Sequence, residues 1–183
     1  MINRKIFSAV IIMIFSASCA HSYSGGDGTE SNPYLIATAE DLAQIGGEAY
    51  YSLTNSITLP EEWETIPEFT GYLDGSNHTI TVKDSVIFNS VKGSIKALNV
   101  NGKIFRAGGA GGIALELRGG TIQDCTVSID IEGVRQGEDT HADSGGIAAV
   151  MRSGTITGCD VNGKIRVYGI TFPRIGGITA GKY

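Results

Sequence analysis

The chain has 183 residues, including 26 glycines and only 4 prolines, and its formal net charge is −5 at pH 7. This length fits a single domain. An acidic chain without a run of basic residues is a poor ligand for nucleic acid or anionic lipid headgroups, and we exclude both as partners. Because the glycines are spread through β-branched segments, the composition indicates an all-β domain with many tight turns.

Residues 1–18 have the pattern of a secretory signal peptide. Arg4 and Lys5 precede an apolar run that extends from Ile6 to Phe15, and small residues follow it. A basic segment, an apolar segment and small residues, in that order, are typical of export signals. The apolar run is shorter than the roughly 20 residues that a membrane-spanning helix needs.

Cys19 is the candidate lipid-attachment residue. Small residues directly before a cysteine at the end of a signal resemble the bacterial lipobox, and Ser16 stands where that pattern prefers an aliphatic residue. Cleavage after Ala20 is the alternative, and it would discard Cys19. Cleavage before Cys19 removes Arg4 and Lys5, two of the 14 basic residues, and keeps all 19 acidic ones, so the mature chain is more acidic. We therefore expect an exported protein at the outer membrane or cell surface, attached to the membrane through its lipid alone.

Two segments with different expected structures lie between the signal and the repeats. Residues 19–31 are expected to be a flexible tether, and residues 32–80 an N-terminal capping segment. Thr38 can cap a short helix, with Asp41 at the capping-box position, and a glycine pair ends it. Residues 50–59 are typical of a strand. A stack of strands exposes unpaired backbone at its open end, so its terminal unit needs a different design.

Residues 81–183 contain repeats. A Gly-Gly-Ile motif starts at Gly111, Gly145 and Gly176. A second motif starts at Gly93, Gly120 and Gly154, and its second interval is longer than its first. Short strands that recur in this way, with no helical pattern between them, indicate stacked coils. Unequal intervals fit one coil per repeat, with a loop of variable length. We expect a right-handed parallel β-helix, or solenoid, behind an N-terminal cap that contains one short helix.

The apolar residues within one repeat alternate with polar ones. The residues expected to point inward are Ile122, Cys125, Val127, Ile129 and Ile131. Those expected to point outward are Asp124, Thr126, Ser128, Asp130 and Glu132. Alternation with a period of two indicates half-buried strands. The phase slips once, between Ile122 and Cys125, as expected for a corner between two strands.

Equivalent positions in successive coils should form columns. The inward columns are expected to be Leu98, Cys125 and Cys159, and Val100, Val127 and Val161. Outward, Lys103, Asp130 and Lys164 should line up, as should Glu132 and Arg166. Adjacent strands about 4.8 Å apart would place these charges as ion pairs and the two cysteines within disulfide range. Cys125 and Cys159 are either bonded, as export permits, or stacked as small buried side chains.

Several segments resemble a known bacterial surface module. They are NPYLIATAEDL at 32–42, YSLTN at 51–55, Trp63 and FTGYLDGSNHTI at 69–80. The Gly-Gly-Ile-Ala repeats that follow resemble the GLUG motif. The resemblance covers residues 24–183 and implies a relationship to secreted adhesin-like proteins and to the non-catalytic region of IgA-cleaving metallopeptidases. The zinc-binding His-Glu-x-x-His of those peptidases is absent, and the third repeat is short, as in a fragment of a larger surface protein.

No catalytic, metal or cofactor site is expected. None of His21, His78 and His141 has another histidine or cysteine at metal-ligand spacing. Asp130 and Glu132 share an outward face, so a carbohydrate-active β-helix enzyme, a polysaccharide lyase or a glycosidase, is the alternative reading. Their neighbours Lys164 and Arg166 explain them equally well as ion pairs.

These observations favour a non-enzymatic surface protein, either a stiff spacer or an adhesin-like binding module. Its expected partners are a glycan or an extracellular protein, with end-to-end contact through the open C-terminal coil as a further mode of association. The aromatic residues that could contact a ligand are Tyr50, Tyr51, Trp63, Tyr72 and Tyr168. Because such residues more often pack in cores and caps, none is assigned to a site from the sequence.

Overall fold

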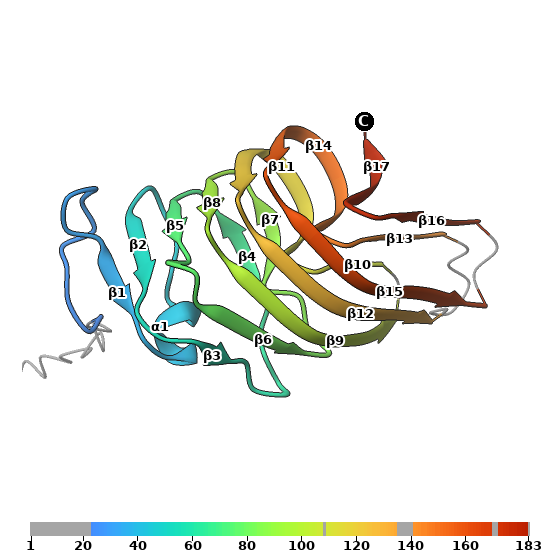
Figure 1. The fold of residues 1–183 in the computed structure, drawn as a ribbon, viewed down its shortest axis with the longest axis horizontal. Helices are drawn as coiled ribbons and strands as arrows, with labels where there is room; N and C mark the ends of the chain where they lie inside the picture. Colours follow the sequence, from blue (N-terminus) through green and yellow to red (C-terminus); the bar gives the residue numbers. More distant parts are fainter. Residues whose placement is uncertain (1–22, 108, 135–140, 170–171, 183) are drawn as a thin grey trace, which may run out of the picture.

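The structure is a computed structural model, and it describes residues 23–107, 109–134, 141–169 and 172–182. These residues form stacked coils of β-strands, and Figure 1 shows the coils following one another from the N-terminal to the C-terminal end. One short helix, α1, lies near the N-terminal end of the stack. All pairs among the named strands are parallel.

The largest sheet, called the long sheet below, has nine strands. Its main path is β1 (Tyr34–Ile36), β2 (Tyr50–Leu53), β5 (Tyr72–Asp74), β8 (Ser94–Lys96), β11 (Ala114–Gln123), β14 (Ala148–Thr157) and β17 (Thr179–Lys182). The remaining two are β4 (Ile66–Phe69) and β7 (Phe88–Val91), which pair with each other. The first half of β11 continues the β4–β7 ladder, and its second half pairs with β8.

Two further sheets complete the coils. The five-stranded sheet contains β3 (Ile57–Thr58), β6 (Thr79–Lys83), β9 (Asn99–Ala107), β12 (Thr126–Val134) and β15 (Asp160–Tyr168). The three-stranded sheet contains β10 (Ala110–Gly111), β13 (His141–Gly145) and β16 (Phe172–Gly176). From β9 onward, each coil passes through the five-stranded, three-stranded and long sheets in turn. The parallel β-helix expected from the repeats is confirmed.

The register reproduces the repeat offsets of the sequence. Ile122 pairs with Ile95 and with Ile156, so each of the two unequal intervals between motifs is one coil. Val127 lies between Val100 and Val161 in the five-stranded sheet. The outward column of Lys103, Asp130 and Lys164 and the pairing of Glu132 with Arg166 are also confirmed as register neighbours.

The predicted corner between Ile122 and Cys125 is formed by a residue in the left-handed backbone region. β11 ends at Gln123, Asp124 has φ 51°, and β12 begins at Thr126. The equivalent residues of the neighbouring coils, Ala97 and Gly158, have φ 49° and 61°. One residue at positive φ turns the chain between two strands, and this turn shifts the apolar phase by one position.

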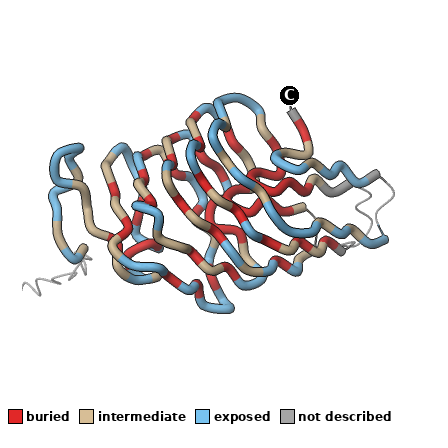
Figure 2. The backbone as a smooth tube through the Cα atoms, in the orientation of Figure 1, coloured by how far each residue is buried: buried red, intermediate tan, exposed pale blue. Residues whose placement is uncertain are grey.

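Buried residues recur along the stacked coils (Figure 2), and their apolar side chains form one core. All five predicted inward residues of the central repeat are at most 2% exposed: Ile122, Cys125, Val127, Ile129 and Ile131. Phe69 and Phe88 are the largest fully buried side chains, and their ring centroids are 5.2 Å apart. The alternation read from the sequence therefore identifies the core of the repeats correctly.

Helix α1 spans Ala39–Ala43 and has the predicted N-cap. The Thr38 hydroxyl accepts a hydrogen bond from the Asp41 N–H at 3.1 Å. The Asp41 carboxylate accepts from the N–H groups of Thr38 and Ala37 at 3.1 and 2.9 Å. This arrangement satisfies donors that would otherwise be unpaired at the helix start. The helix thereby holds Leu42 in the core, where it is fully buried.

The coils begin earlier than the sequence indicates. Strands β1 to β5 lie within the segment 32–80 that was expected to be a cap, and β6 begins in it; all six belong to the same sheets as the repeats. Tyr50 pairs with Tyr72, and Tyr72 with Ser94, so these coils take fewer residues than those of the repeats. They are shorter because they lack a strand of the three-stranded sheet.

The described part of the expected tether, residues 23–31, folds against the first coil. The Tyr23 ring lies 4.5 Å from the Tyr34 ring and 5.9 Å from the Tyr51 ring, measured between centroids. Its hydroxyl donates to the Gln44 carbonyl at 2.8 Å. Packed aromatic rings bury a large apolar area, which is why this segment packs where a tether was expected.

The C-terminal end of the stack leaves apolar side chains accessible. Ile175 and Ile178 are 50% and 46% exposed, whereas Ile147, one coil earlier, is fully buried. Val161 and Ile165 on β15 are half-buried. No further described strand pairs with β15, β16 or β17 on their outer side, so this end carries both unpaired backbone and apolar surface.

Glu116 joins two strands of the long sheet through ion pairs. Its carboxylate accepts hydrogen bonds from Arg152 on β14 at 3.0 and 3.3 Å and from Arg118 on β11. The bonds from Arg152 and then from Arg118 hold the pKa of Glu116 below its ordinary value. A lowered pKa means that the carboxylate stabilises the fold when ionised.

This contribution is expected to depend on pH. It should be complete above the ordinary glutamate pKa and should be lost as the pH falls through the lowered pKa of the folded state. Glu116→Gln should therefore lower the free energy of unfolding at pH 7 by about 1 kcal/mol and by much less near pH 3. Urea unfolding of both proteins at the two pH values measures the difference. An equal loss at both would show that the ionised carboxylate contributes nothing.

Candidate ligand-binding groove

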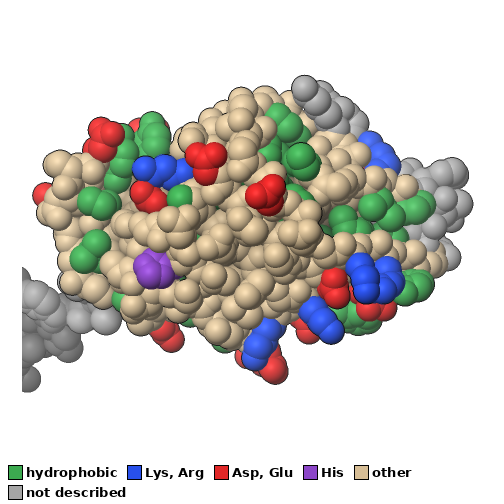
Figure 3. All heavy atoms as spheres, in the orientation of Figure 1, with side chains coloured by type: hydrophobic (Ala, Val, Ile, Leu, Met, Phe, Trp, Pro, Cys, Tyr) green, Lys and Arg blue, Asp and Glu red, His purple; other side chains and the backbone are tan. Residues whose placement is uncertain are grey.

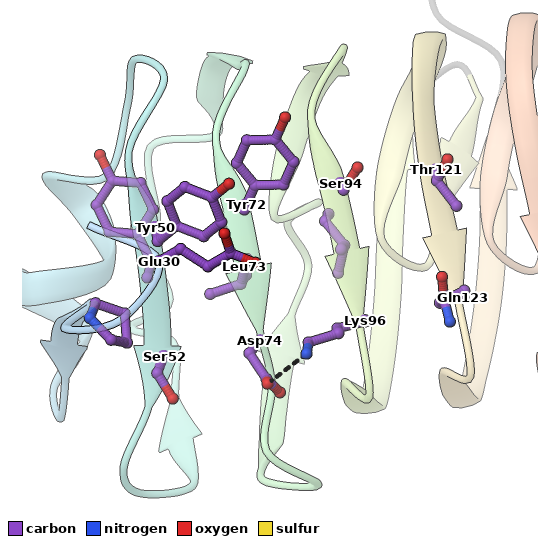
Figure 4. A pocket seen from close by; sticks show the side chains of 13 residues that line it. Glu30, Tyr50, Ser52, Tyr72, Leu73, Asp74, Ser94, Lys96, Thr121 and Gln123 are labelled. Atoms are coloured by element: carbon purple, nitrogen blue, oxygen red, sulfur yellow. Dashed lines mark ion pairs between the residues drawn. The ribbon is translucent and has the colours of Figure 1, made fainter. Parts of the chain in front are cut away.

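A groove with a volume of about 280 Å³ crosses the outer face of the long sheet (Figure 4). Its floor and sides come from outward side chains of β2, β5, β8 and β11, and the turn that contains Glu30 and Pro33 closes one end. Four parallel strands in register place equivalent side chains side by side. The groove is therefore built by stacking alone, from residues that are far apart in the sequence.

Two rows of side chains cross the four strands. One row is Tyr50, Tyr72, Ser94 and Thr121, and the other is Ser52, Asp74, Lys96 and Gln123. Between them, the inward positions are filled by Tyr51, Leu73, Ile95 and Ile122, all of which are buried. The first row thus has two aromatic side chains at one end and two small hydroxyl-bearing side chains at the other. The second row is polar throughout.

Tyr50 and Tyr72 stack with their ring centroids 4.4 Å apart and an interplanar angle of 10°. Tyr72 remains 46% exposed. Partial burial, and then the nearby Glu30 carboxylate and Tyr72 itself, raise the pKa of Tyr50 above its ordinary value. The Tyr50 hydroxyl is therefore neutral at physiological pH, and the two stacked rings present a rigid aromatic surface to solvent.

Asp74 and Lys96 form an ion pair of 3.0 Å along the second row, marked by the dashed line in Figure 4. Asp74 also accepts a hydrogen bond from the Ser76 N–H at 2.8 Å. Burial by itself would raise the pKa of Asp74, but the bonds from Ser76 and Lys96 outweigh it, and the pKa is lowered. The polar side of the groove thus carries an ionised carboxylate in a fixed position.

The other aromatic candidates lie elsewhere. Tyr51 and Trp63 are 3% and 8% exposed and belong to the core, which is the common role of such residues. Tyr168 is 50% exposed, but it ends β15 in the five-stranded sheet. Of the five aromatic residues considered from the sequence, the structure brings only Tyr50 and Tyr72 together at one outward site.

Asp130 and Glu132 line a smaller hollow of about 150 Å³ on the five-stranded sheet, with Asp84, Lys103 and Arg166 among its other residues. Oδ1 of Asp130 accepts from the Lys164 N–H at 3.0 Å. No side-chain ion pair within 4.0 Å joins these two carboxylates to a cation among the described residues. The expected ion pairs are therefore not formed, although the register is as predicted and Lys164 and Arg166 are exposed. Figure 3 shows side chains of both charges next to one another along this edge.

Cys125 and Cys159 are adjacent in one column, and both are free thiols in this structure. Cys125 is buried, its N–H points at the Cys159 Sγ at 3.5 Å, and its own Sγ lies 3.2 Å from the Gln123 carbonyl oxygen. Burial raises the pKa of the Cys125 thiol to about 12. The two thiols are thus placed as stacked core side chains. Cys19 lies outside the described residues.

The described part of residues 23–182 contains no cluster of side chains that could bind a metal ion. No three histidine, cysteine, aspartate or glutamate side chains gather there. Within the same residues, the structure contains no helix of the length and apolarity that a membrane span requires. His21 lies outside the described residues, and the backbone of His78 joins the turn between β5 and β6 to β9.

Comparison with solved structures supports the fold. The chain is similar to a crystal structure of a "putative immunoglobulin A1 protease" from Bacteroides ovatus, with a TM-score of 0.60 and 17% sequence identity. The similarity covers 90% of this chain and 66% of that chain, so this protein spans about two thirds of its length. No protein-family model matches the chain. No curated protein matches it either.

Proposed function

We propose that this protein is a non-enzymatic, adhesin-like binding module of the cell surface, carried at the envelope by a lipid on Cys19. The observation that carries the proposal is the groove on the outer face of the long sheet, where Tyr50 and Tyr72 stack beside the Asp74–Lys96 pair. The GLUG-like repeats support it, because that resemblance implies a relationship to adhesin-like proteins.

The solenoid suits such a role physically. Each strand of the groove is hydrogen-bonded to neighbours on both sides, so ligand contacts are fixed before binding and little conformational entropy is lost. Exposed tyrosines in fixed positions give a large contact area. The groove lies on the coils that follow Cys19 most closely, and the later coils extend the stack beyond it.

The arrangement of carboxylates favours binding over hydrolysis. In the groove, Asp74 is held by Lys96 and Ser76 and is ionised, so it has no proton to give to a leaving group. On the five-stranded sheet, Asp130 accepts a backbone hydrogen bond. Glycoside hydrolysis needs a carboxylic acid with a raised pKa beside a second carboxylate. The enzymatic alternative therefore rests on Asp130 and Glu132, which lie outside the groove, and their alanine variants test it.

The proposal predicts that cells carrying the full chain adhere to a glycan or an extracellular matrix protein. Cells with the wild-type protein should bind at least one member of an immobilised glycan and matrix-protein array. Cells with Cys19→Ser should lose this adhesion, because the protein is no longer anchored, while the released protein still binds the same array member.

Two results would contradict this function. One is a folded protein that binds no member of the array. The other is the release of reducing or unsaturated sugar ends from a polysaccharide panel, with loss of that release in Asp130→Ala or Glu132→Ala, which would establish the enzyme.

A further inference from the structure

We infer that the groove binds a neutral, hydroxyl-rich oligosaccharide, with one sugar ring packed against Tyr72. This inference rests on the proposed function and specifies its ligand. It is carried by three features of the groove: an uncovered aromatic face, hydroxyl groups beside that face, and a surplus of negative charge.

The aromatic face comes from a change of residue size along one row. Tyr50 covers one face of the Tyr72 ring at 4.4 Å. On the opposite side, the next strand places Ser94 next to Tyr72, and β11 places Thr121 beyond it. A third aromatic residue at position 94 would complete the stack. Because both side chains are small, the second face of the Tyr72 ring is left open to the groove (Figure 4).

A flat apolar face of this kind fits the C–H-bearing side of a sugar ring, which packs on an aromatic ring as other apolar groups do. Tyr50 holds the Tyr72 ring in one orientation, since the two rings are nearly parallel at 10°. The binding surface is thus formed before the ligand arrives, which reduces the entropy that binding costs.

The hydrogen-bonding groups stand where the hydroxyls of a packed ring would lie. Ser94 and Thr121 each carry a hydroxyl that donates one bond and accepts others. In the part of the chain that the structure describes, neither hydroxyl is engaged by another side chain. Across the groove, Oδ1 of Asp74 accepts from the N–H and the hydroxyl of Ser76. Its Oδ2 accepts from Lys96 and can accept a further bond from a sugar hydroxyl.

Charge selects a neutral ligand over an acidic one. Two carboxylates, Glu30 and Asp74, line the groove against one ammonium group, Lys96, which Asp74 already holds at 3.0 Å. The chain as a whole is also negative, at −5. A uronate or sulfated chain would bring more negative charge to this site and would be repelled.

The groove accommodates a short stretch of glycan. It crosses four strands, but Tyr50 covers one face of Tyr72, so the open part runs from Tyr72 to β11 over two strand spacings, about 10 Å. That length holds one or two sugar rings. The turn at Glu30 and Pro33 blocks one end, so a bound glycan would run from Tyr72 toward β11.

The test is calorimetric titration of the mature protein with neutral oligosaccharides of glucose, galactose, mannose and N-acetylglucosamine. Polygalacturonate and a sulfated glycosaminoglycan serve as the anionic probes. At least one neutral series should bind, and the anionic probes should not. Tyr72→Ala should weaken that binding by about tenfold, whereas Tyr72→Phe, which keeps the ring, should bind within about threefold of wild type.

The matched control is Tyr168→Ala, because Tyr168 is as exposed as Tyr72 but lies in the five-stranded sheet. It should leave glycan binding unchanged, and urea unfolding of each variant verifies that the fold is intact. Preference for an anionic glycan, or equal losses in Tyr72→Ala and Tyr168→Ala, overturns the inference. Binding confined to a matrix protein also overturns it but leaves the proposed function standing, whereas no binding to any array member removes both.

Discussion

Replacing Phe88 with alanine is expected to lower the free energy of unfolding by about 3–5 kcal/mol. Phe88 is fully buried at the centre of the stack, between Ile66 on β4 and Ala114 on β11. Its ring contacts the Phe69 ring at a centroid distance of 5.2 Å. Because parallel strands hold the surrounding backbone in place on both sides, the cavity cannot close, and the loss should reach the upper part of this range.

The matched control is Phe105→Ala. Phe105 is 54% exposed on β9, and the hydrogen bond from its N–H to Asp84 does not involve the side chain. Removing its ring should change the free energy of unfolding by less than about 0.5 kcal/mol. Urea unfolding, followed by circular dichroism, measures both variants. Equal losses in the two would mean that the ring of Phe88 is not enclosed by neighbouring coils as described.

The repeats were predictable because their side chains recur together with the backbone. Val100, Val127 and Val161 follow the same two unequal intervals as the glycine motifs, and the structure pairs them at those intervals. Alternation within β12 then separates the inward from the outward residues, and the phase slip locates the corner at Asp124. In such segments the sequence pattern and the stacking geometry carry the same information.

The earlier coils were not predictable in the same way. Tyr72 and Ser94 are register neighbours although they have nothing in common as side chains. Stacking constrains the backbone and the inward residues, while outward residues are free to differ. A weak signal was present, because each is preceded by a glycine, Gly71 or Gly93, and followed by an aliphatic residue, Leu73 or Ile95.

The groove could not be found from the sequence for a related reason. Tyr50, Tyr51 and Tyr72 look equivalent in the sequence, and only the strand phase shows that Tyr51 points inward while the other two point outward. The stack of Tyr50 on Tyr72 also requires the register of the shorter coils. Outward residues from four coils form the site, so it can be located only when the length of each coil is known.

The glycine repeats have a steric cause that the sequence cannot display. A Cβ atom on Gly112 would collide with the carbonyl oxygen of Gly146 in the next coil and would lie 2.6 Å from Cγ1 of Val127. The same carbonyl oxygen accepts a hydrogen bond from the Gly112 N–H at 3.1 Å, so it cannot move away without breaking the stack. The motif thus marks the places where successive turns approach most closely.

Gly112→Ala is therefore expected to lower the free energy of unfolding by about 3 kcal/mol. The control is Gly177→Ala, at the same position of the last motif, where an added Cβ has no atom within 4 Å. With no clash, this substitution only reduces the freedom of the unfolded chain, and it should be neutral or stabilising by up to about 1 kcal/mol. Urea unfolding of the two variants and of wild type measures the effect. It distinguishes a steric clash between coils from a destabilising effect of alanine at this position in any coil. If both variants lose stability equally, the close approach between coils is not what the glycines serve. If only Gly112→Ala does, the position of a coil within the stack decides whether its glycine is needed.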